Sequence, residues 1–196
     1  LAIPSITKKD IHDINLGIKY NIDWFSLSFV RFAKDIKPII NIFNRENIYI
    51  PVIAKIEKPE AILNLDEIID KFDGILVARG DLGVEESLAK VPVLQKNIIE
   101  KCTKAKKPVI VATQILESMI ENSSPTRAEV NDVANSVYDG VDAVMLSGET
   151  AIGKYPIDSV SIMSEIINDV ENSIETKIGQ VDAVRNDNRI AIGHAV

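Results

Sequence analysis

Short apolar runs rich in β-branched residues recur along the chain, separated by polar segments and by glycine or proline. Each run is nearly continuous in hydrophobicity rather than alternating, which is typical of parallel strands covered on both faces. Segments with helical period lie between the runs; Leu94, Ile98 and Cys102, for example, recur at four-residue steps. The pattern predicts repeated helix–strand units with five strands, at residues 24–30, 49–56, 74–78, 108–113 and 141–146.

Two helix starts are marked by a hydroxyl residue that is followed three positions later by an acid. Thr7 precedes Asp10, and Thr126 precedes Glu129. Both spacings predict capping boxes, in which side chain and backbone satisfy each other's hydrogen bonds at the first turn. Helical period is expected to fade from about Glu171, where the chain becomes polar, so we expect a linker in this region.

Strict alternation of strands and helices leaves two main architectures, an open doubly wound sheet and a (β/α)8 barrel. A dinucleotide-binding doubly wound sheet usually carries G-x-G-x-x-G after its first strand, and the chain has no such spacing. This favours the barrel. Because a barrel needs eight strands and typically about 250 residues, we expect an α/β fold that is an incomplete (β/α)8 TIM barrel of about five βα units.

Composition narrows the function classes further. The 196 residues carry a net charge of -7, with 29 acidic and 22 basic residues spread along the chain and no basic stripe for nucleic acid or an anionic membrane. The apolar runs are far shorter than the roughly 18–20 residues of a membrane span. A single cysteine, Cys102, and the lack of a signal segment predict a reducing, cytosol-like compartment. The first residue, Leu1, is expected to mark a piece of a longer chain.

Charged and hydroxyl residues gather where four successive predicted strands end. In parallel α/β folds this edge is where ligands bind, because the loops that follow the strands converge there. One such coincidence would mean little, but four predict a site. The groups are Lys55 with Glu57, Arg79-Gly80-Asp81, Thr113-Gln114 and Ser147-Gly148-Glu149.

Lys55 and Glu57 are the first pair of interest, because residues two apart in an extended strand point to the same side. Taken alone, such a pair is more often a solvated strand end. Asp81 ends the next strand and adds a second carboxylate, and Mg²⁺ favours sites with one or two carboxylates, waters and substrate phosphates. A nearby lysine stabilises a phosphoryl group in transfer. The set therefore suggests metal-assisted phosphoryl or enolate chemistry.

Glycines and hydroxyls complete the candidate site. Gly80 and Gly83 flank Asp81, so backbone amides can approach an anion closely; the alternative is a tight turn. An adhesion role for the Arg-Gly-Asp tripeptide is disfavoured directly after a buried strand. Thr113 and Ser147 can position a substrate or relay a proton through water, and the alternative for either is a helix N-cap.

Taken together, these motifs closely resemble the pyruvate kinase family. The segment IPVIAKIEKPEAI is similar to that family's active-site signature, with Lys55 and Glu57 at the family's spacing. Four more segments match in the same order, and the resemblance spans residues 1–172. The matching segments are residues 50–62, 77–83, 112–119, 125–129 and 145–151.

The resemblance implies an organisation and an activity. Residues 1–172 would be part of the catalytic barrel domain, contributing strands 4 to 8; residues 173–188 would be a linker, and residues 189–196 the start of a C-terminal regulatory domain. The implied reaction is glycolytic: phosphoenolpyruvate and ADP give pyruvate and ATP. We expect the segment alone to be inactive, since part of the site lies elsewhere and two strand edges are open.

The resemblance also implies residue roles. Glu57 and Asp81 would bind Mg²⁺ or Mn²⁺, and Lys55 would stabilise the phosphoryl group and the enolate. The amides of Gly80 and Asp81 would hold the substrate carboxylate together with Thr113.

Thr113 and Ser147 would belong to the network that delivers a proton to the enolate. Potassium would bind outside this chain. The partners implied are phosphoenolpyruvate and ADP, with neither nucleic acid nor membrane, and the full-length protein would be a homotetramer. Its expected location is the cytoplasm, with an organellar copy as the alternative. Two alternatives stay open, a metal-dependent pyruvate aldolase-like barrel and a catalytically dead kinase-like interaction module.

Overall fold

All five predicted strands are present in the structure, a computed structural model that describes residues 6–184 and the side chains of residues 6–174. Each strand lies inside the range predicted for it and is shorter than that range or equal to it. Within the described residues the strands are β1 (Phe25–Leu27), β2 (Val52–Ile56), β3 (Gly74–Ala78), β4 (Val109–Ala112) and β5 (Ala143–Met145).

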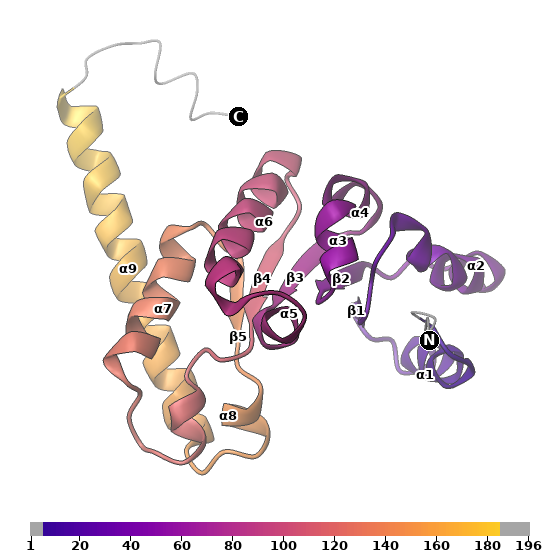
Figure 1. Cartoon of the computed structure of the whole chain (residues 1–196), viewed down its shortest axis with the longest axis horizontal. Helices are drawn as coiled ribbons and strands as arrows, with labels where there is room; N and C mark the ends of the chain where they lie inside the picture. Colours follow the sequence, from indigo (N-terminus) through magenta and orange to yellow (C-terminus); the bar gives the residue numbers. More distant parts are fainter. Residues whose placement is uncertain (1–5, 185–196) are drawn as a thin grey trace.

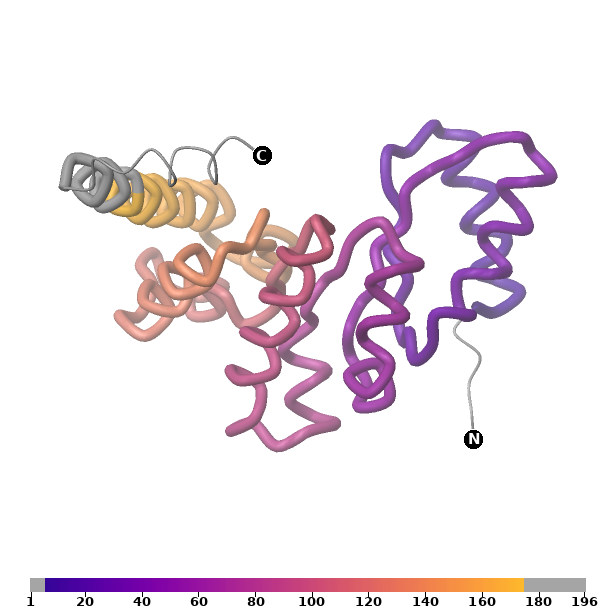
Figure 2. Tube along the Cα trace, turned by 90° about the horizontal axis from the view of Figure 1, so that it is seen from above, coloured from indigo at the N-terminus to yellow at the C-terminus, as the bar shows by residue number. Residues whose placement is uncertain are grey.

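The strands form one parallel sheet in the order β1-β2-β3-β4-β5. The register pairs Ala54 with Ile75, Val77 with Val111, and Val111 with Val144. The units follow one another across the molecule in chain order, without turning back (Figure 2). Doubly wound sheets reverse their strand order at a switch point. The strictly sequential order is that of a singly wound sheet, as in (β/α)8 barrels.

Helices fill the connections between the strands (Figure 1). The two predicted capping boxes are confirmed: Thr7 caps α1 together with Asp10, and Thr126 caps α7 together with Glu129. No helix in the described part of the chain is long and apolar enough to cross a membrane. The helices are α1 (Lys8–Lys19), η1 (Ala33–Ile36), α2 (Lys37–Glu46), α3 (Pro59–Leu63), α4 (Leu65–Lys71), α5 (Arg79–Glu85), η2 (Leu88–Lys90), α6 (Val91–Ala105), η3 (Glu117–Ile120), α7 (Arg127–Tyr138), α8 (Gly148–Ala151) and α9 (Pro156–Val184).

The pleat of the central strands divides their side chains between two faces of the sheet. Ile75 and Val77 of β3 belong to the main core, which also contains residues of α2, α4 and α6. Leu76 and Ala78, at the alternating positions, form a small second cluster with Ala112 of β4. Because side chains alternate along a strand, this second cluster marks the face of the sheet that is turned away from the main core.

Two details differ from the pattern of the sequence. Trp24 opens the first predicted strand but is 45% exposed, because it directly precedes β1, a strand with only one neighbour in the described sheet. Helical period was expected to fade from Glu171, yet α9 runs from Pro156 to Val184. The expected linker therefore begins as helix, and its residues beyond 184, with the expected start of a further domain at 189–196, lie outside the described residues.

Candidate active site

The predicted site residues lie at one edge of the sheet. All five strands run in the same direction, so the segments that follow β1, β2, β3, β4 and β5 emerge at their carboxyl ends side by side. In order along this edge come Ser28, Glu57, Asp81, Thr113 and Ser147. Three non-glycine residues here adopt left-handed backbone conformations, a strain that proteins often keep at functional sites. They are Phe29 (φ 57°), Thr113 (φ 67°) and Gln114 (φ 53°).

Lys55 and Glu57 form a close ion pair, as their spacing predicted. Lys55 occupies the same face of β2 as Ile53, which packs against the second cluster, and its Nζ lies 2.6 Å from Glu57 Oε1. The ammonium also donates to Ser28 Oγ at 3.1 Å. Glu57 is only 1% exposed, and its Oε2 accepts the Phe29 amide at 2.7 Å. The pair therefore links the ends of β1 and β2.

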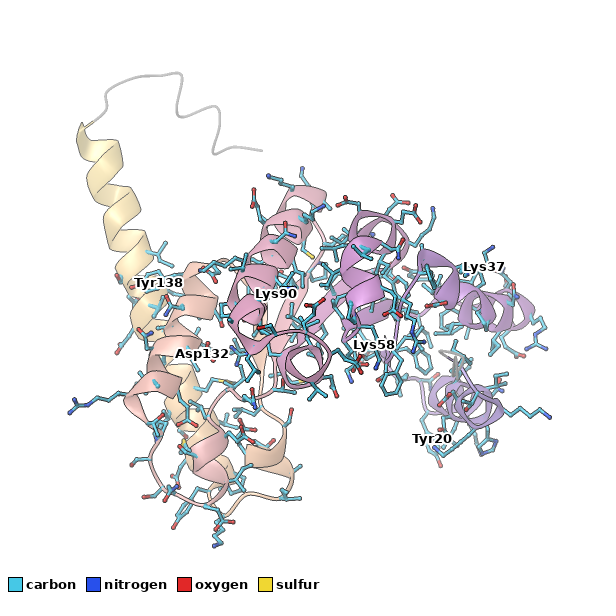
Figure 3. The ribbon with its side chains drawn as sticks, in the orientation of Figure 1. Tyr20, Lys37, Lys58, Lys90, Asp132 and Tyr138 are labelled. Atoms are coloured by element: carbon cyan, nitrogen blue, oxygen red, sulfur yellow. The ribbon has the colours of Figure 1, made fainter. Side chains whose placement is uncertain are left out.

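The loop after β1 is also held from the neighbouring unit. Lys58 is labelled in Figure 3; its Nζ lies 5.6 Å from the centre of the Phe29 ring and donates to Glu85 at 2.5 Å. Phe29 is thus fixed through its amide by Glu57 and through its ring by Lys58.

Asp81 follows β3 in the first turn of α5 and is exposed. Within the described residues its carboxylate has neither a hydrogen bond nor an ion pair. No group of three or more His, Cys, Asp or Glu that could hold a metal ion is present in that part of the chain. Glu57 and Asp81, which follow the neighbouring strands β2 and β3, would therefore form at most a two-carboxylate donor set. Such a set fits Mg²⁺ or Mn²⁺ only when waters and substrate oxygens complete the coordination, which is the usual mode for magnesium.

Thr113 and Gly80 make direct contact across the ends of β4 and β3. The Gly80 amide donates to Thr113 Oγ1 at 2.7 Å, and that hydroxyl donates to the Ala112 carbonyl at 2.6 Å. A Cβ at position 80 would stand 3.3 Å from Thr113 Oγ1, so a side chain there would crowd the hydroxyl. Thr113 is therefore not a helix N-cap, and its hydroxyl is part of the strand-end network.

Ser147 follows β5 and precedes α8, where its side chain makes no capping hydrogen bond. Its amide donates to Glu149 Oε2 at 2.8 Å, and Glu149 Oε1 accepts the Leu116 amide at 3.0 Å. Glu149 is 3% exposed. This buried carboxylate joins the loop after β4 to the loop after β5, so the hydroxyls of Thr113 and Ser147 are carried on connected segments.

Comparison with known proteins places this chain in a family. The family model described as "Pyruvate kinase, barrel domain" matches residues 1–160. The chain belongs to the pyruvate kinase family. The pyruvate kinase of Mycobacterium intracellulare is 53% identical over 173 residues, which are 88% of this chain and 37% of that protein. Pyruvate kinase 2 of Synechocystis is 46% identical over 196 residues, all of this chain and 33% of that protein.

Solved structures agree with this assignment. A crystal structure of a pyruvate kinase from Cryptosporidium parvum superposes with a TM-score of 0.84 at 47% identity, covering 87% of this chain and 36% of that chain. The chain thus spans about a third of the length of the pyruvate kinases that it matches. The α/β barrel domain expected from the sequence is the domain that the family model describes.

Four groups at this strand edge were either missed in the sequence analysis or named in it without a role. Ser28 and the Phe29 amide follow the first strand, and the rule that found the other strand ends would have found them. Arg79 and Glu149 were named at strand ends, but their contacts are with backbone groups of distant loops. Short-range spacing carries no signal for such contacts.

The groups with the most strongly raised pKa values lie away from the strand-end edge. Burial raises the pKa of the Cys102 thiol in α6 to about 12. A hydrogen bond to Asp73, with partial burial, raises the pKa of Tyr49 to about 12. Tyr49 precedes β2, at the opposite end of the strand from Glu57. Neither group lies at the strand-end edge.

Proposed function

We propose that this chain supplies the phosphoryl-transfer and proton-delivery side of a pyruvate kinase active site. In this reaction an ADP β-phosphate oxygen attacks the phosphorus of phosphoenolpyruvate, the bond between that phosphorus and the enol oxygen breaks, and the enolate takes a proton at C3. The observation that carries the proposal is the Lys55–Glu57 pair at the end of β2, in a chain of this family. Asp81 follows the neighbouring strand β3, and its carboxylate has no partner among the described residues.

Glu57 and Asp81 would hold the divalent cation, which would neutralise charge on the phosphoryl oxygens and on the enolate oxygen. The Lys55 ammonium lies beside Glu57, and the Lys55 side chain is about a quarter exposed, so the ammonium is within reach of a ligand bound at this carboxylate. A cation placed there stabilises the phosphoryl group in transfer and then the enolate oxygen, where negative charge develops.

The loops after β3 and β4 would hold the substrate carboxylate. In the structure the Gly80 amide is engaged by Thr113 Oγ1. Rotation of the Thr113 side chain would free this amide, which with the Asp81 amide could then bind a carboxylate oxygen while the hydroxyl donates to the same group. Thr113 and Ser147 would carry the proton network, since Glu149 connects their loops.

The test is turnover by the complete polypeptide that carries this chain, measured in a lactate-dehydrogenase-coupled assay. Phosphoenolpyruvate, ADP, Mg²⁺ and K⁺ are supplied. We expect Glu57→Gln and Asp81→Asn to raise the Mg²⁺ concentration needed for half-maximal rate and to lower kcat at least 100-fold. Asp70→Asn, at an exposed aspartate of α4 paired with Lys71, is the matched control and should stay within twofold of the unmodified protein.

Failure of the proposal would take recognisable forms. Cleavage of oxaloacetate without nucleotide, together with no phosphoryl transfer, would indicate the aldolase alternative. No turnover of either kind in a folded, full-length protein would indicate the interaction module. Turnover that is unchanged in Glu57→Gln would contradict the metal assignment.

We also propose that β1 to β5 are strands 4 to 8 of the complete barrel, that the barrel part of the chain ends near residue 172, and that the full-length protein is a homotetramer. In the described sheet β1 and β5 each pair with one neighbour, so the 196-residue segment should be inactive when purified alone. Turnover by that segment, free of host enzyme, would contradict this expectation. Light scattering on the full-length protein tests the tetramer.

A further inference from the structure

Arg79 is a buried cation that the proposed reaction does not use. It is the first residue of α5, directly after β3, and only 8% of the residue is exposed. A buried guanidinium needs partners for its donors. Here they come from α6, α7 and the loop after β4: Gln95 at 3.5 Å, Asp132 at 2.7 Å and two backbone carbonyls.

The two carbonyls belong to the most strained segment of the site edge. Arg79 Nη2 donates to the Thr113 carbonyl and to the Gln114 carbonyl, each at 2.8 Å, and Nε donates again to the Thr113 carbonyl at 3.2 Å. Thr113 and Gln114 are consecutive left-handed residues, a conformation that is costly for L-residues and most costly for a β-branched one. The guanidinium is placed to stabilise this conformation.

The backbone conformation of Thr113 determines where its hydroxyl lies. Arg79 is covalently followed by Gly80, whose amide donates to Thr113 Oγ1 at 2.7 Å. One dipeptide therefore holds the carbonyl and the hydroxyl of the same threonine. Asp132, labelled on α7 in Figure 3, orients the far side of the guanidinium. A lysine would keep the charge but lacks the planar fork that reaches both carbonyls.

We propose that Arg79 is a positioning residue, which keeps Thr113 left-handed and so aims its hydroxyl for delivery of the proton to the enolate. This role rests on the proposed function and adds a residue to it. A role in stability alone would leave the chemistry of the folded protein unchanged. The positioning role requires that loss of the planar Arg79 guanidinium slows proton transfer through Thr113.

The experiment compares Arg79→Lys with Arg45→Lys, an exposed arginine of α2, in the complete polypeptide. Two rates are measured: turnover of phosphoenolpyruvate and exchange of the pyruvate C3 protons for deuterium, followed by proton NMR. The exchange is the reverse of enolate protonation. Misplacing a reacting group by about 1 Å costs about 100-fold, so we expect Arg79→Lys to lower the exchange rate by 10- to 100-fold, with Arg45→Lys unchanged.

Two further variants distinguish positioning of the Thr113 hydroxyl from an unspecific loss of activity. In a Thr113→Ala background, Arg79→Lys should change the exchange rate less than threefold, because the hydroxyl that it positions is gone. Gln114→Gly should restore part of the activity of Arg79→Lys, since glycine adopts the left-handed conformation without penalty. Equal losses in both backgrounds, or no rescue by glycine, would overturn the proposal.

Folding is checked separately. If Arg79→Lys does not fold, Asp132→Asn releases one side of the guanidinium and should lower the exchange rate several-fold in the same direction; an unchanged rate in that variant overturns the proposal. A crystal structure of the folded Arg79→Lys variant is independent of activity. If Thr113 stays left-handed in that structure, the inference is overturned. Lack of turnover in the unmodified protein would instead contradict the proposed function.

Discussion

Replacing Glu149 by glutamine should loosen two site loops at once. The side chain is 3% exposed, and its two oxygens accept the amides of Leu116 and Ser147 at 3.0 Å and 2.8 Å. Glutamine has almost the same shape but offers one oxygen and one NH2 group. One of the two amides would therefore face a donor in place of an acceptor.

The size of the effect follows from these contacts. A hydrogen bond to a charged group contributes about 1.5–3 kcal/mol, and a buried donor left without an acceptor costs about 1–3 kcal/mol. Local opening of at least one loop should therefore become easier by about 1.5–3 kcal/mol. At about 1.4 kcal/mol per factor of ten, the amide should exchange with solvent about 10- to 150-fold faster.

Hydrogen exchange followed by mass spectrometry measures this directly, on peptides that cover residues 113–118 and 145–150 of the complete polypeptide. Glu117→Gln, at an exposed position in η3, is the matched control and should exchange as the unmodified protein does. Unchanged exchange of both peptides in Glu149→Gln would refute the view that this carboxylate holds the loops. A uniform increase over the whole chain would refute it also, because that result reports global destabilisation.

Three further predictions concern stability and reactivity. Phe43 is 1% exposed and its ring lies 5.8 Å from Phe25, so Phe43→Ala should lower the free energy of unfolding by about 3–5 kcal/mol in urea titrations; a loss below 1 kcal/mol would contradict this packing. Cys102 is buried with a thiol pKa raised to about 12, so iodoacetamide at pH 8 should label it only after unfolding, and rapid labelling of native protein would contradict its burial. Burial acts to raise the pKa of Glu129, but hydrogen bonds from Ser118 and Thr126 outweigh this effect and lower the pKa below its ordinary value of 4.5. The ionised Glu129 therefore stabilises the folded state above its unfolded pKa, and this contribution is lost as the pH falls through the lowered folded pKa. Urea titrations should accordingly show that Glu129→Gln is destabilising at pH 7 but nearly neutral near pH 2.

The strands were predictable because local pattern and packing agree in them. In β2 the alternating residues Val52, Ala54 and Ile56 are fully buried, and the two-residue spacing of Lys55 and Glu57 correctly predicted that both face one side. The strand ends were less predictable. The fourth strand was expected to include Thr113, a good strand former, but β4 ends at Ala112 because Thr113 turns left-handed.

Contacts between distant loops explain what the sequence could not reveal. Thr113 is held by Arg79, 34 residues earlier, and Leu116 by Glu149, 33 residues later. Neither contact has a local spacing that marks it. Buried charged side chains that bind backbone groups depend on how the units pack, so their partners become visible only in the folded structure.

The end of the helical region was misjudged for a different reason. Polar residues between 173 and 184 suggested a loss of period, yet Ile174, Ile178 and Val181 follow steps of four and three residues. This narrow apolar spacing is compatible with a helix, and α9 continues to Val184. The polar content of the segment concealed the period.

The most direct measurement compares Lys55→Met with the unmodified complete polypeptide in the coupled assay, with phosphoenolpyruvate, ADP, Mg²⁺ and K⁺. Lys37→Met, at the exposed start of α2 and labelled in Figure 3, is the control. Because the ammonium would stabilise charge that develops in the transition state, its loss should lower kcat by at least about 100- to 1000-fold, with the control unchanged. A Lys55→Met variant that turns over at the unmodified rate would contradict a phosphoryl-transfer site at this edge of the sheet.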